Sequence, residues 1–476
     1  MSIEDRLYRW LGKYLDAPQW LKTPVGLAYG CLPKAMRYGA GYRRFLAEAQ
    51  LRCPDTLALL ADERLRRTLR WAAETVPAYA GVLALLCDGA PVEAWLAAFP
   101  LTTRLDLKRH PQAYRSTACP PEAGLPMQTS GSSSEPLRFV LERGLTRCKE
   151  TAYIDSFNRR LGYRRRETIL SLRGRNVRGE QAGVTHSYDP IKRMLAISPN
   201  HLTDALMPDH VAAARRHRVT GIQGYPSAVY LLARWLDDHP GQADFARRVR
   251  GVQLFSETVE PFMLETIRRV FGCPVLLHYG HSERAVMAAS MPDDPRYFVW
   301  PLYGKVELVD HDGCVITEPG VSGEIVVTGF DNRVMPFIRY RTGDIAQWSA
   351  GPAHPELPGF AVLERIEGRD SDFIYGRDGR AIPMTSVGGL RPPAFTRIDA
   401  LQYEQFEPGR LIVRLQAGAG LSPETCSELQ QFFQTKFHGM VDAELREVSS
   451  MARTANGKLR TIVQHIGADA EARTHA

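Results

Sequence analysis

Apolar positions recur with a helical period through much of the first 120 residues. In the segment 55–76 they fall near one stripe of a helix, and arginines fall opposite them. Pro77 follows directly and cannot continue a helix, because it has no backbone N–H to donate. The apolar stripe consists of Leu57, Leu60, Leu65, Leu69 and Ala72. We therefore predict a long amphipathic helix within a helical N-terminal extension that covers about residues 1–120.

The opening segment is amphipathic as well. Its large apolar side chains are Leu7, Trp10, Leu11, Tyr14, Leu15 and Trp20. Such a segment either packs on the rest of the protein or lies on a membrane surface. Packing is the commoner outcome, so we expect it here and keep peripheral membrane contact as the alternative.

Between residues 125 and 345 the pattern changes to short apolar runs that alternate with helical segments. The runs 168–172, 251–256 and 273–280 are typical of strands, whereas 226–239 and 261–272 are helical. This alternation predicts an α/β fold with a buried, parallel-type sheet. The strands 305–310 and 323–330, which alternate apolar and polar residues, then follow with Gly-rich turns between them.

A Pro- and Gly-rich interval at 349–360 precedes a compact unit at the C-terminus. The pattern there is strand at 400–406, strand at 410–416, helix at 423–437 and strand at 443–450. This order predicts a small α+β domain of about 100 residues. We place the boundary near 367–372 and so divide the chain into 1–368 and 369–476.

Composition narrows the class of protein. With 44% hydrophobic and 24% charged residues, and with no apolar run of 18 residues, the chain is typical of a globular protein without a transmembrane segment or signal peptide. The eight cysteines form no C-x-x-C and lack zinc-type spacing, so we expect reduced thiols, no structural zinc and a cytoplasmic location. The net charge of +7 favours anionic partners. The arginines of the chain stand in scattered clusters without interleaved aromatic residues, which argues against nucleic acid as the partner.

Polar motifs follow several of the predicted strands. The Ser-rich stretch 129–134 is either a surface loop or a phosphate cradle, since its hydroxyl and free N–H groups can wrap an anion. "YGHSE" exposes Ser282 and Glu283 at the carboxyl end of a strand, where open α/β sheets bind ligands. "RYRTGD" predicts a tight turn that presents Asp344, and "RTANGK" carries Lys458 near the tail. Each of these alone is also consistent with an ordinary turn.

Together with "RIEGRDSD" at 365–372, these motifs in this order resemble the adenylate-forming superfamily, which contains acyl-CoA synthetases, aryl ligases and peptide-synthetase adenylation domains. The stretches "GYPSAVYLLARWL", "FSETVEP", "YGHSERA" and "NRVMPFIRYRTGDIA" are most similar to the phenylacetate-CoA ligase group and its CapK-type relatives. The resemblance implies a large N-terminal adenylation domain of several subdomains and a small, mobile C-terminal domain. It also implies that ATP and a carboxylic acid react to give an acyl-adenylate and pyrophosphate, before the acyl group passes to an acceptor in a biosynthetic pathway.

The resemblance also implies roles for individual residues. Lys458 would bridge the carboxylate and the α-phosphate, Ser282 would touch that phosphate, and Glu283 would hold Mg²⁺. Tyr279 would stack on adenine and Asp344 would accept hydrogen bonds from the ribose. The other implied ATP-binding residues are Thr129, Ser130, Gly131, Ser132, Ser133, Glu257, Gly280 and Arg369. The substrate pocket would include Tyr225, Pro226, Ser227 and His281, with the region 185–189 nearby.

Three departures from the family pattern keep alternatives open. Ser134 replaces a second loop glycine, and Ser371 stands at the usual hinge aspartate, between Asp370 and Asp372. The segment "IYGRDGRAIPMTSVGG" differs from the strand and turn that line the pantetheine tunnel of CoA ligases. An amine, hydroxyl or carrier protein is therefore the favoured acceptor, and an acyl-CoA ligase is the first alternative. A nucleotidyltransferase that adenylates a hydroxyl and a non-catalytic homologue are the others.

Overall fold

The N-terminal region is helical, as predicted. The computed structural model describes residues 3–7, 14, 17–129, 137–164, 167–173, 185–242, 244–369, 373–377, 381–383, 393–417, 420–437, 439–451, 453 and 459–466. Its first elements are α1 (Ile3–Leu7), α3 (Gln19–Cys31), α4 (Lys34–Tyr38), α5 (Ala40–Glu48), α6 (Pro54–Thr75), η2 (Pro77–Leu85), α7 (Val92–Ala97), α8 (Arg104–Arg109) and η3 (Pro121–Ala123). The predicted stripe of α6 faces inwards: Leu57, Leu65, Leu69 and Ala72 are buried, and Leu60 is partly buried.

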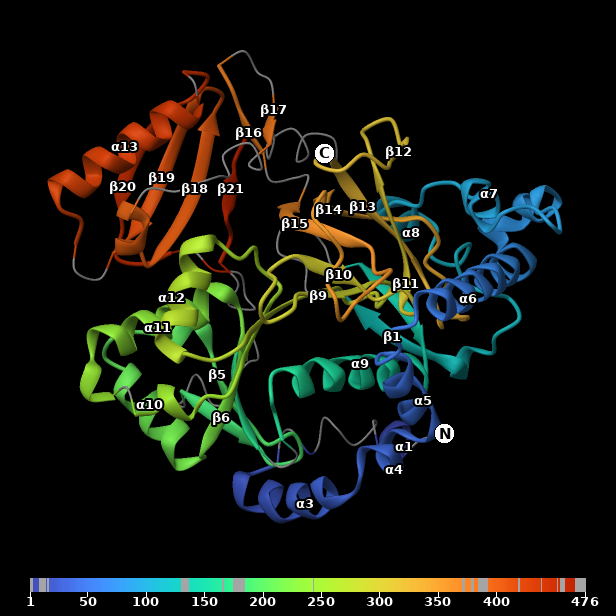
Figure 1. Cartoon of the computed structure of the whole chain (residues 1–476), viewed down its shortest axis with the longest axis horizontal. Coiled ribbons are helices and arrows are strands. Elements are labelled where there is room, and N and C mark those ends of the chain that lie inside the picture. The colour runs from blue at the N-terminus through green and yellow to red at the C-terminus, as the bar shows by residue number, and fades with distance from the viewer. Residues whose placement is uncertain are drawn as a thin grey trace, which may run out of the picture.

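The opening segment packs on the protein in part. Tyr14 lines the main cavity, whereas the indole of Trp20 is 75% exposed on α3. Figure 1 shows α3 at the edge of the molecule that is farthest from the C-terminal strands. No helix among the described residues is both long enough and apolar enough to cross a membrane.

The described strands of the central region form a 13-stranded sheet. Its order is β12-β11-β13-β14-β15-β10-β9-β8-β7-β6-β3-β5-β4. The strands are β3 (Thr168–Leu172), β4 (His186–Asp189), β5 (Met194–Ile197), β6 (Val219–Gly224), β7 (Val252–Phe255), β8 (Val275–Gly280), β9 (Met287–Ala289), β10 (Tyr297–Val299), β11 (Gly304–Val309), β12 (Val315–Ile316), β13 (Ser322–Gly329), β14 (Tyr340–Trp348) and β15 (Val362–Arg369). Strands β5, β3, β6, β7 and β8 run parallel, and the half beyond β8 is antiparallel.

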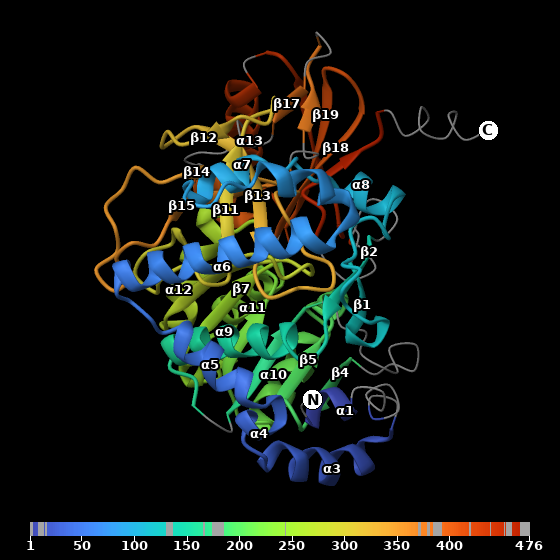
Figure 2. The same ribbon diagram turned by 90° about the vertical axis from the view of Figure 1, so that its right-hand side faces the viewer.

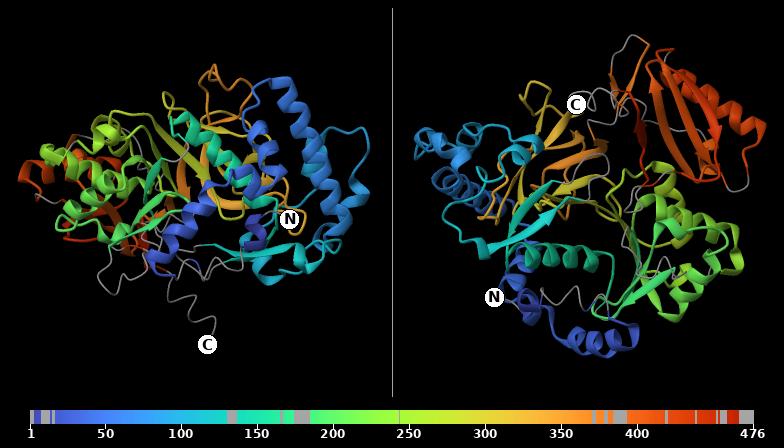
Figure 3. Two further views of the ribbon diagram at one scale, coloured as in Figure 1. Left: turned by 90° about the horizontal axis from the view of Figure 1, so that it is seen from below. Right: turned by 180° about the vertical axis from the view of Figure 1, so that it is seen from behind.

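Helices cover both faces of the parallel half (Figures 1 and 3). On one face lie α10 (Met207–Arg216), α11 (Pro226–Asp238) and α12 (Pro261–Phe271), with the short turns η5 (Pro199–His201), η6 (Pro240–Gln242) and η7 (Ala246–Arg248) between them. On the other face lie α9 (Thr146–Arg160) and α5. Neighbouring residues of β8 divide between the two layers, since Leu277 packs with α12 residues and Leu276 with α9 residues. The predicted α/β architecture is thereby confirmed.

The antiparallel half carries α6 across one side, as Figure 2 shows, and a separate pair of strands, β1 (Gly124–Gln128) and β2 (Arg138–Glu142), lies beside it. One sequence prediction is wrong here. Thr342, Gly343 and Asp344 do not form a tight turn, because they lie within β14, where Asp344 pairs with Arg369 of β15. Gly343 adopts a φ of 77° there, a left-handed conformation that glycine tolerates and that bends the strand locally.

The C-terminal unit has the predicted strand, strand, helix, strand order. Its sheet has the order β20-β19-β18-β21, built from β18 (Ala400–Glu407), β19 (Arg410–Gln416), β20 (Asp442–Glu447) and β21 (Ile462–Gln464), and α13 (Pro423–Phe437) packs on it. A hairpin of β16 (Phe373–Tyr375) and β17 (Ala381–Pro383) and the turn η9 (Pro393–Arg397) connect it to the large sheet. The unit docks on α11, where the Tyr230 hydroxyl donates to the Ile398 carbonyl at 2.8 Å. The predicted hinge residues 370–372 lie outside the described residues.

Candidate active site

A single cavity of about 1670 Å³ brings together most of the described residues that the motifs had marked. It runs from the carboxyl ends of β7 and β8 to the N-terminal helices, and α9 and β14 also contribute side chains. Pockets for one small molecule typically occupy about 300–1,000 Å³. The cavity therefore has room for a nucleotide and a second substrate.

Tyr279 and Asp344 meet inside this cavity although they lie on different strands. The Tyr279 hydroxyl donates a hydrogen bond of 2.7 Å to Oδ2 of Asp344. Burial, followed by the charge of Asp344, raises the pKa of Tyr279 well above its ordinary value, so the phenol keeps its proton and stays a donor. The pair fixes the Asp344 carboxylate at the cavity wall.

The backbone around Asp344 is held by a second carboxylate. Oε1 of Glu324 accepts the Gly343 N–H at 2.9 Å, and the Thr342 hydroxyl donates to the Ile325 carbonyl at 2.8 Å. The Thr342 hydroxyl oxygen in turn accepts the Asp344 N–H at 3.1 Å. These bonds stabilise the irregular part of β14, where the register with β13 shifts.

The sequence suggested that Glu283 is exposed at the end of a strand. In the structure it is buried, with 6% of its surface accessible, and it lines the cavity. Its Oε1 accepts the Tyr340 hydroxyl at 3.2 Å, and its Oε2 lies 3.1 Å from Nδ1 of His281. Burial alone would raise the pKa of Glu283, but His281 and Tyr340 outweigh it and hold that pKa below its ordinary value. The carboxylate is therefore anionic at neutral pH, as an oxygen ligand for Mg²⁺ must be.

Glu257 connects the large sheet to the tail of the chain. Its Oε2 accepts the Ser227 N–H at 3.1 Å, at the start of α11, and its Oε1 accepts the Leu459 N–H at 3.0 Å. Burial raises the pKa of Glu257, and its hydrogen bonds and the nearby Arg453 oppose that rise only in part. Lys458 lies outside the described residues, but the segment 459–464 that follows it lines the cavity.

Thr129 marks one end of the Ser-rich stretch. Its N–H donates to the Leu137 carbonyl, and its Oγ1 accepts the Leu137 N–H, both at 3.0 Å. Thr129 itself lines the cavity, so the two ends of the stretch are joined at the cavity edge. Ser130, Gly131, Ser132 and Ser133 lie outside the described residues.

Other predicted residues divide between the cavity wall and the layer behind it. Gly280, His281 and Ser282 line the cavity. The backbone of Arg369 pairs with Asp344, at the end of β15. Tyr225, Pro226 and Ser227 are not among the described residues of the lining. They are buried at the start of α11, where Tyr225 packs into the apolar core beneath the sheet.

Several cavity residues were missed in the sequence. Arg104 lies at the start of α8 and directs Nη2 to Oγ1 of Thr129 at 3.4 Å. The start of α8 is fixed by a capping box, in which Thr103 and Asp106 exchange backbone and side-chain hydrogen bonds. The pattern "TRLD" is a recognisable signal for that helix start, but not for its position beside the Ser-rich stretch. Gln223, Gln253 and His278 also line the cavity, and no local pattern distinguishes them.

His278 gives the site a measurable pH dependence. Burial lowers its pKa to about 4, whereas a histidine in an unfolded chain titrates near pH ~6.5. The unfolded chain therefore takes up the proton first, so the stabilisation is complete above about pH 6.5 and is lost as the pH falls towards about 4. The unfolding free energy of the wild type should fall between about pH 7 and pH 5. In His278→Gln we expect this fall to be smaller by about 1–2 kcal/mol. Urea unfolding at both pH values measures this.

His311→Gln is the control for that measurement, because the His311 side chain is 89% exposed. It should leave the pH dependence of the unfolding free energy as it is in the wild type. Equal pH dependence in the wild type and in His278→Gln would contradict the prediction.

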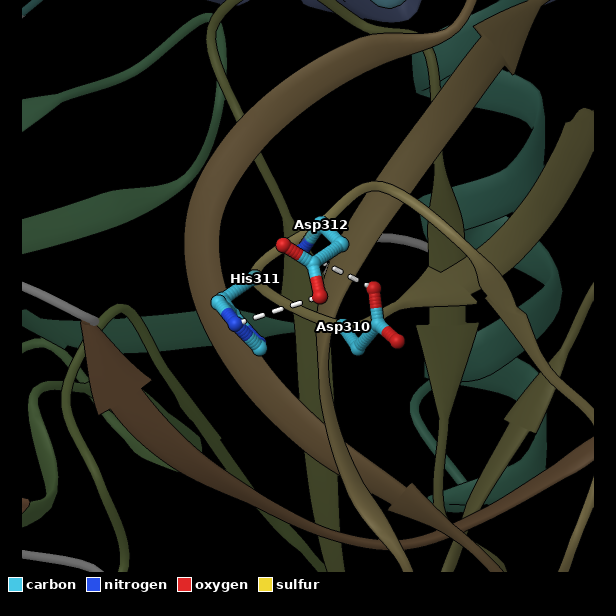
Figure 4. A group of neighbouring side chains, drawn as sticks. All are labelled: Asp310, His311 and Asp312. Carbon is cyan, nitrogen blue, oxygen red and sulfur yellow. Dashed lines mark hydrogen bonds and ion pairs between the residues drawn. The ribbon is translucent and has the colours of Figure 1, made fainter.

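Asp310, His311 and Asp312 form a separate polar group in the turn between β11 and β12 (Figure 4). Their ligand atoms lie within 4.8 Å of one another. Oδ1 of Asp310, however, already accepts the N–H groups of Asp312 at 3.0 Å and of Cys314 at 2.8 Å. The group is thus explained by the turn that it stabilises, and it is remote from the cavity lining.

Comparison with known proteins supports the same interpretation. The family model described as AMP-binding enzyme matches residues 194–336, which include Glu257, Tyr279 and Glu283. Protein CapK of Staphylococcus aureus is 22% identical over 354 residues, covering 71% of this chain and 74% of that protein. Phenylacetate-coenzyme A ligase of Escherichia coli (strain K12) is 30% identical over 127 residues, covering 25% of this chain and 28% of that protein.

The fold has solved counterparts. A crystal structure of 2-hydroxyisobutyryl-CoA ligase in the postadenylation state, in complex with R3-HIB-AMP, superposes with a TM-score of 0.65 at 18% identity. The superposition covers 87% of this chain and 91% of that one, so it includes both the large sheet and the C-terminal unit. The family match, the sequence relatives and the fold therefore agree in making this chain similar to the adenylate-forming AMP-binding enzymes.

Proposed function

We propose that this protein is an ATP-dependent ligase that activates a carboxylic acid. An oxygen of the substrate carboxylate attacks the α-phosphorus of ATP, the bond to the β-phosphate oxygen breaks, and pyrophosphate leaves. The product is an acyl-adenylate. An acceptor then attacks its carbonyl carbon and releases AMP, so one ATP is converted to AMP and pyrophosphate for each acyl group transferred.

The observation that carries this proposal is the convergence of three distant motifs on one cavity. Glu283, Asp344 and Leu459 all border it, although Leu459 is 115 residues beyond Asp344 (459 − 344 = 115). In the proposed roles Glu283 faces the phosphates, Asp344 holds the ribose, and Lys458, next to Leu459, approaches the α-phosphate. Negative charge develops on phosphoryl oxygens in this reaction, so fixed cations and positioning supply most of the catalysis.

Mg²⁺ fits the donor set that the cavity offers. Glu283 would hold this ion, which would supply positive charge to neutralise the phosphoryl oxygens. Glu283 suits this role because its pKa is held low while it faces the cavity. Ser282 would donate to the α-phosphate from the same loop, and Thr129 would hold the Ser-rich stretch against the β- and γ-phosphates.

The acceptor is proposed as an amine, a hydroxyl, a carrier protein or a thiol such as CoA. The structural neighbour named above is a CoA ligase by its own name, which supports including CoA. The departure of this chain at 374–389 from the usual pantetheine-tunnel segment favours the other acceptors. We further propose a cytoplasmic location, which its eight free cysteines support, and a C-terminal domain from residue 369 that moves between the two half-reactions.

The proposal is tested by incubating the protein with ATP, Mg²⁺, hydroxylamine and a panel of chemically varied acids. We expect acid-dependent release of pyrophosphate and formation of the hydroxamate, with free AMP as the second product. A product that retains the AMP group would instead identify nucleotidyl transfer to a hydroxyl. ATP binding without pyrophosphate release for any acid would contradict the proposed activity.

A further inference from the structure

We propose that the acid carries a hydroxyl or amide group, and no ammonium group, in addition to the carboxylate that reacts. This inference rests on the proposed function and names the substrate class of the same cavity. It is carried by three amide side chains that line the cavity: Asn158, Gln223 and Gln253. We call these three residues the amide wall.

Two members of the amide wall stand side by side in the parallel sheet. Gln223 of β6 pairs in register with Gln253 of β7, and on its other side Gln223 pairs with Ser171 of β3. Paired residues of neighbouring strands point to the same face. A row of three polar side chains therefore crosses the middle strands of the parallel half, on the face that lines the cavity.

A polar row at this place is costly unless something binds to it. Strands of parallel sheets are normally apolar on both faces, because helices cover both. On the opposite face the same strands obey this rule, since Leu172, Ile222 and Leu254 are all buried in the apolar core. An amide that is removed from water without a hydrogen bond destabilises the folded state. A ligand with hydrogen-bonding groups would therefore stabilise this polar face.

The hydrogen-bonding capacity of the amide wall is not used up by the described residues. Gln253 is 1% exposed, and its Nε2 has no hydrogen-bond partner among them. Oδ1 of Asn158, on α9, is likewise buried without a partner in the described part of the chain. Nε2 of Gln223 donates to the Met194 sulfur at 3.4 Å, and its contact with the Ser171 hydroxyl, also at 3.4 Å, is longer than the usual N–H···O bond. A donor and an acceptor are therefore available to a ligand.

The described carboxylates of this part of the cavity argue against a positively charged group on the ligand. Glu150 accepts the Tyr303 hydroxyl at 2.5 Å, and Asp155 is paired with Lys34 at 2.5 Å. Asp189 accepts two backbone N–H groups of the turn that follows it. With these carboxylates already engaged, an ammonium group on the acid would lose its water without gaining a free anion. Uncharged amides suit a hydroxyl or an amide, which both donates and accepts.

The test compares acids of nearly equal shape in the pyrophosphate exchange assay. β-Hydroxybutyrate, isovalerate and β-aminobutyrate carry a hydroxyl, a methyl and an ammonium group at the same carbon. p-Hydroxyphenylacetate and p-tolylacetate form a longer pair. We expect kcat/KM to be about tenfold or more higher for the hydroxyl-bearing member of each set. Equal or higher values for the methyl- or ammonium-bearing members would overturn the inference.

Gln253→Leu then tests the amide wall directly. We expect it to lower kcat/KM for the hydroxyl-bearing acid about tenfold, to leave the KM for ATP unchanged, and to leave the melting temperature no lower than in the wild type. Gln347→Leu is the matched control and should change none of these, since the Gln347 amide donates to the Ser322 hydroxyl at an exposed site between β13 and β14. An unchanged preference between the two acids in Gln253→Leu would overturn the inference.

A binding measurement separates this inference from the proposed function. In the presence of AMP, the hydroxyl-bearing acid should raise the melting temperature of the wild type more than the methyl-bearing acid does, and Gln253→Leu should abolish the difference. If no acid supports pyrophosphate exchange but this difference is present, the proposed reaction fails and the substrate class stands. If exchange proceeds without any such difference, the reaction stands and the substrate class fails.

Discussion

Lys458→Ala is expected to slow formation of the acyl-adenylate about 10²- to 10³-fold, which is the usual cost of removing one preorganised donor from a site of developing charge. The neighbouring Leu459 lines the cavity, and its N–H donates to Glu257 at 3.0 Å. Pyrophosphate exchange measures the effect. The KM for ATP should change much less than kcat, because the lysine acts on the reacting groups.

Lys305→Ala serves as the control for this loss of charge, since Lys305 lies on β11 and is not among the described residues of the cavity lining. It should retain the wild-type rate. Transfer of the acyl group from a separately prepared acyl-adenylate provides a second control, because Lys458 is proposed to act in the first half-reaction. Exchange at the wild-type rate in Lys458→Ala would exclude the proposed role of the tail.

Asp344→Asn is expected to lower kcat/KM for ATP by about 10- to 100-fold. The carboxylate would accept both ribose hydroxyls, and a hydrogen bond to a charged group contributes about 1.5–3 kcal/mol. Asparagine keeps the shape but removes the charge and turns half of the group into a donor. Initial rates over a range of ATP concentrations, at a saturating concentration of an accepted acid, measure the change.

Tyr279→Phe separates orientation of the carboxylate from its direct contact with ATP. It removes the hydroxyl that donates to Asp344 at 2.7 Å but leaves the ring and the carboxylate in place. We expect a smaller loss, about tenfold or less, in the same parameter. A loss in Tyr279→Phe equal to that in Asp344→Asn would mean that Asp344 acts only through the tyrosine.

Much of the fold could be predicted from local pattern. The helix that is now α6 has its apolar residues every three or four positions and a proline just beyond it, and the structure confirms both its bounds and its buried stripe. The predicted order of elements at the C-terminus is also confirmed. The spacing of apolar residues there changes from a period of two in the strands to 3.6 in the helix and back to two. The tight turn predicted at Thr342 to Asp344 was wrong, because a bend at a glycine inside a strand uses the same residue types as a turn.

The candidate site was predictable where function requires a contiguous motif. Glu283 and Tyr279 belong to one such motif, and both line the cavity. Tyr225 packs in the apolar core, and the sequence did not indicate this, because an aromatic residue at the start of a helix can face either the core or a ligand. Gln253 gave no signal at all, since a single glutamine in the run "GVQLFS" is equally consistent with an exposed edge strand.

The sequence by itself determined the chemistry that this chain can offer, because hydroxyl-rich stretches, strand-end carboxylates and a tail lysine are local choices of residue type. It also determined the order of helices and strands, because periodicity is local. Only the tertiary structure decided which of these groups meet: Tyr279 with Asp344 across strands, Glu257 with Leu459 across domains, and Gln223 beside Gln253. Those meetings depend on strand register and on the packing of distant segments, which no local pattern encodes.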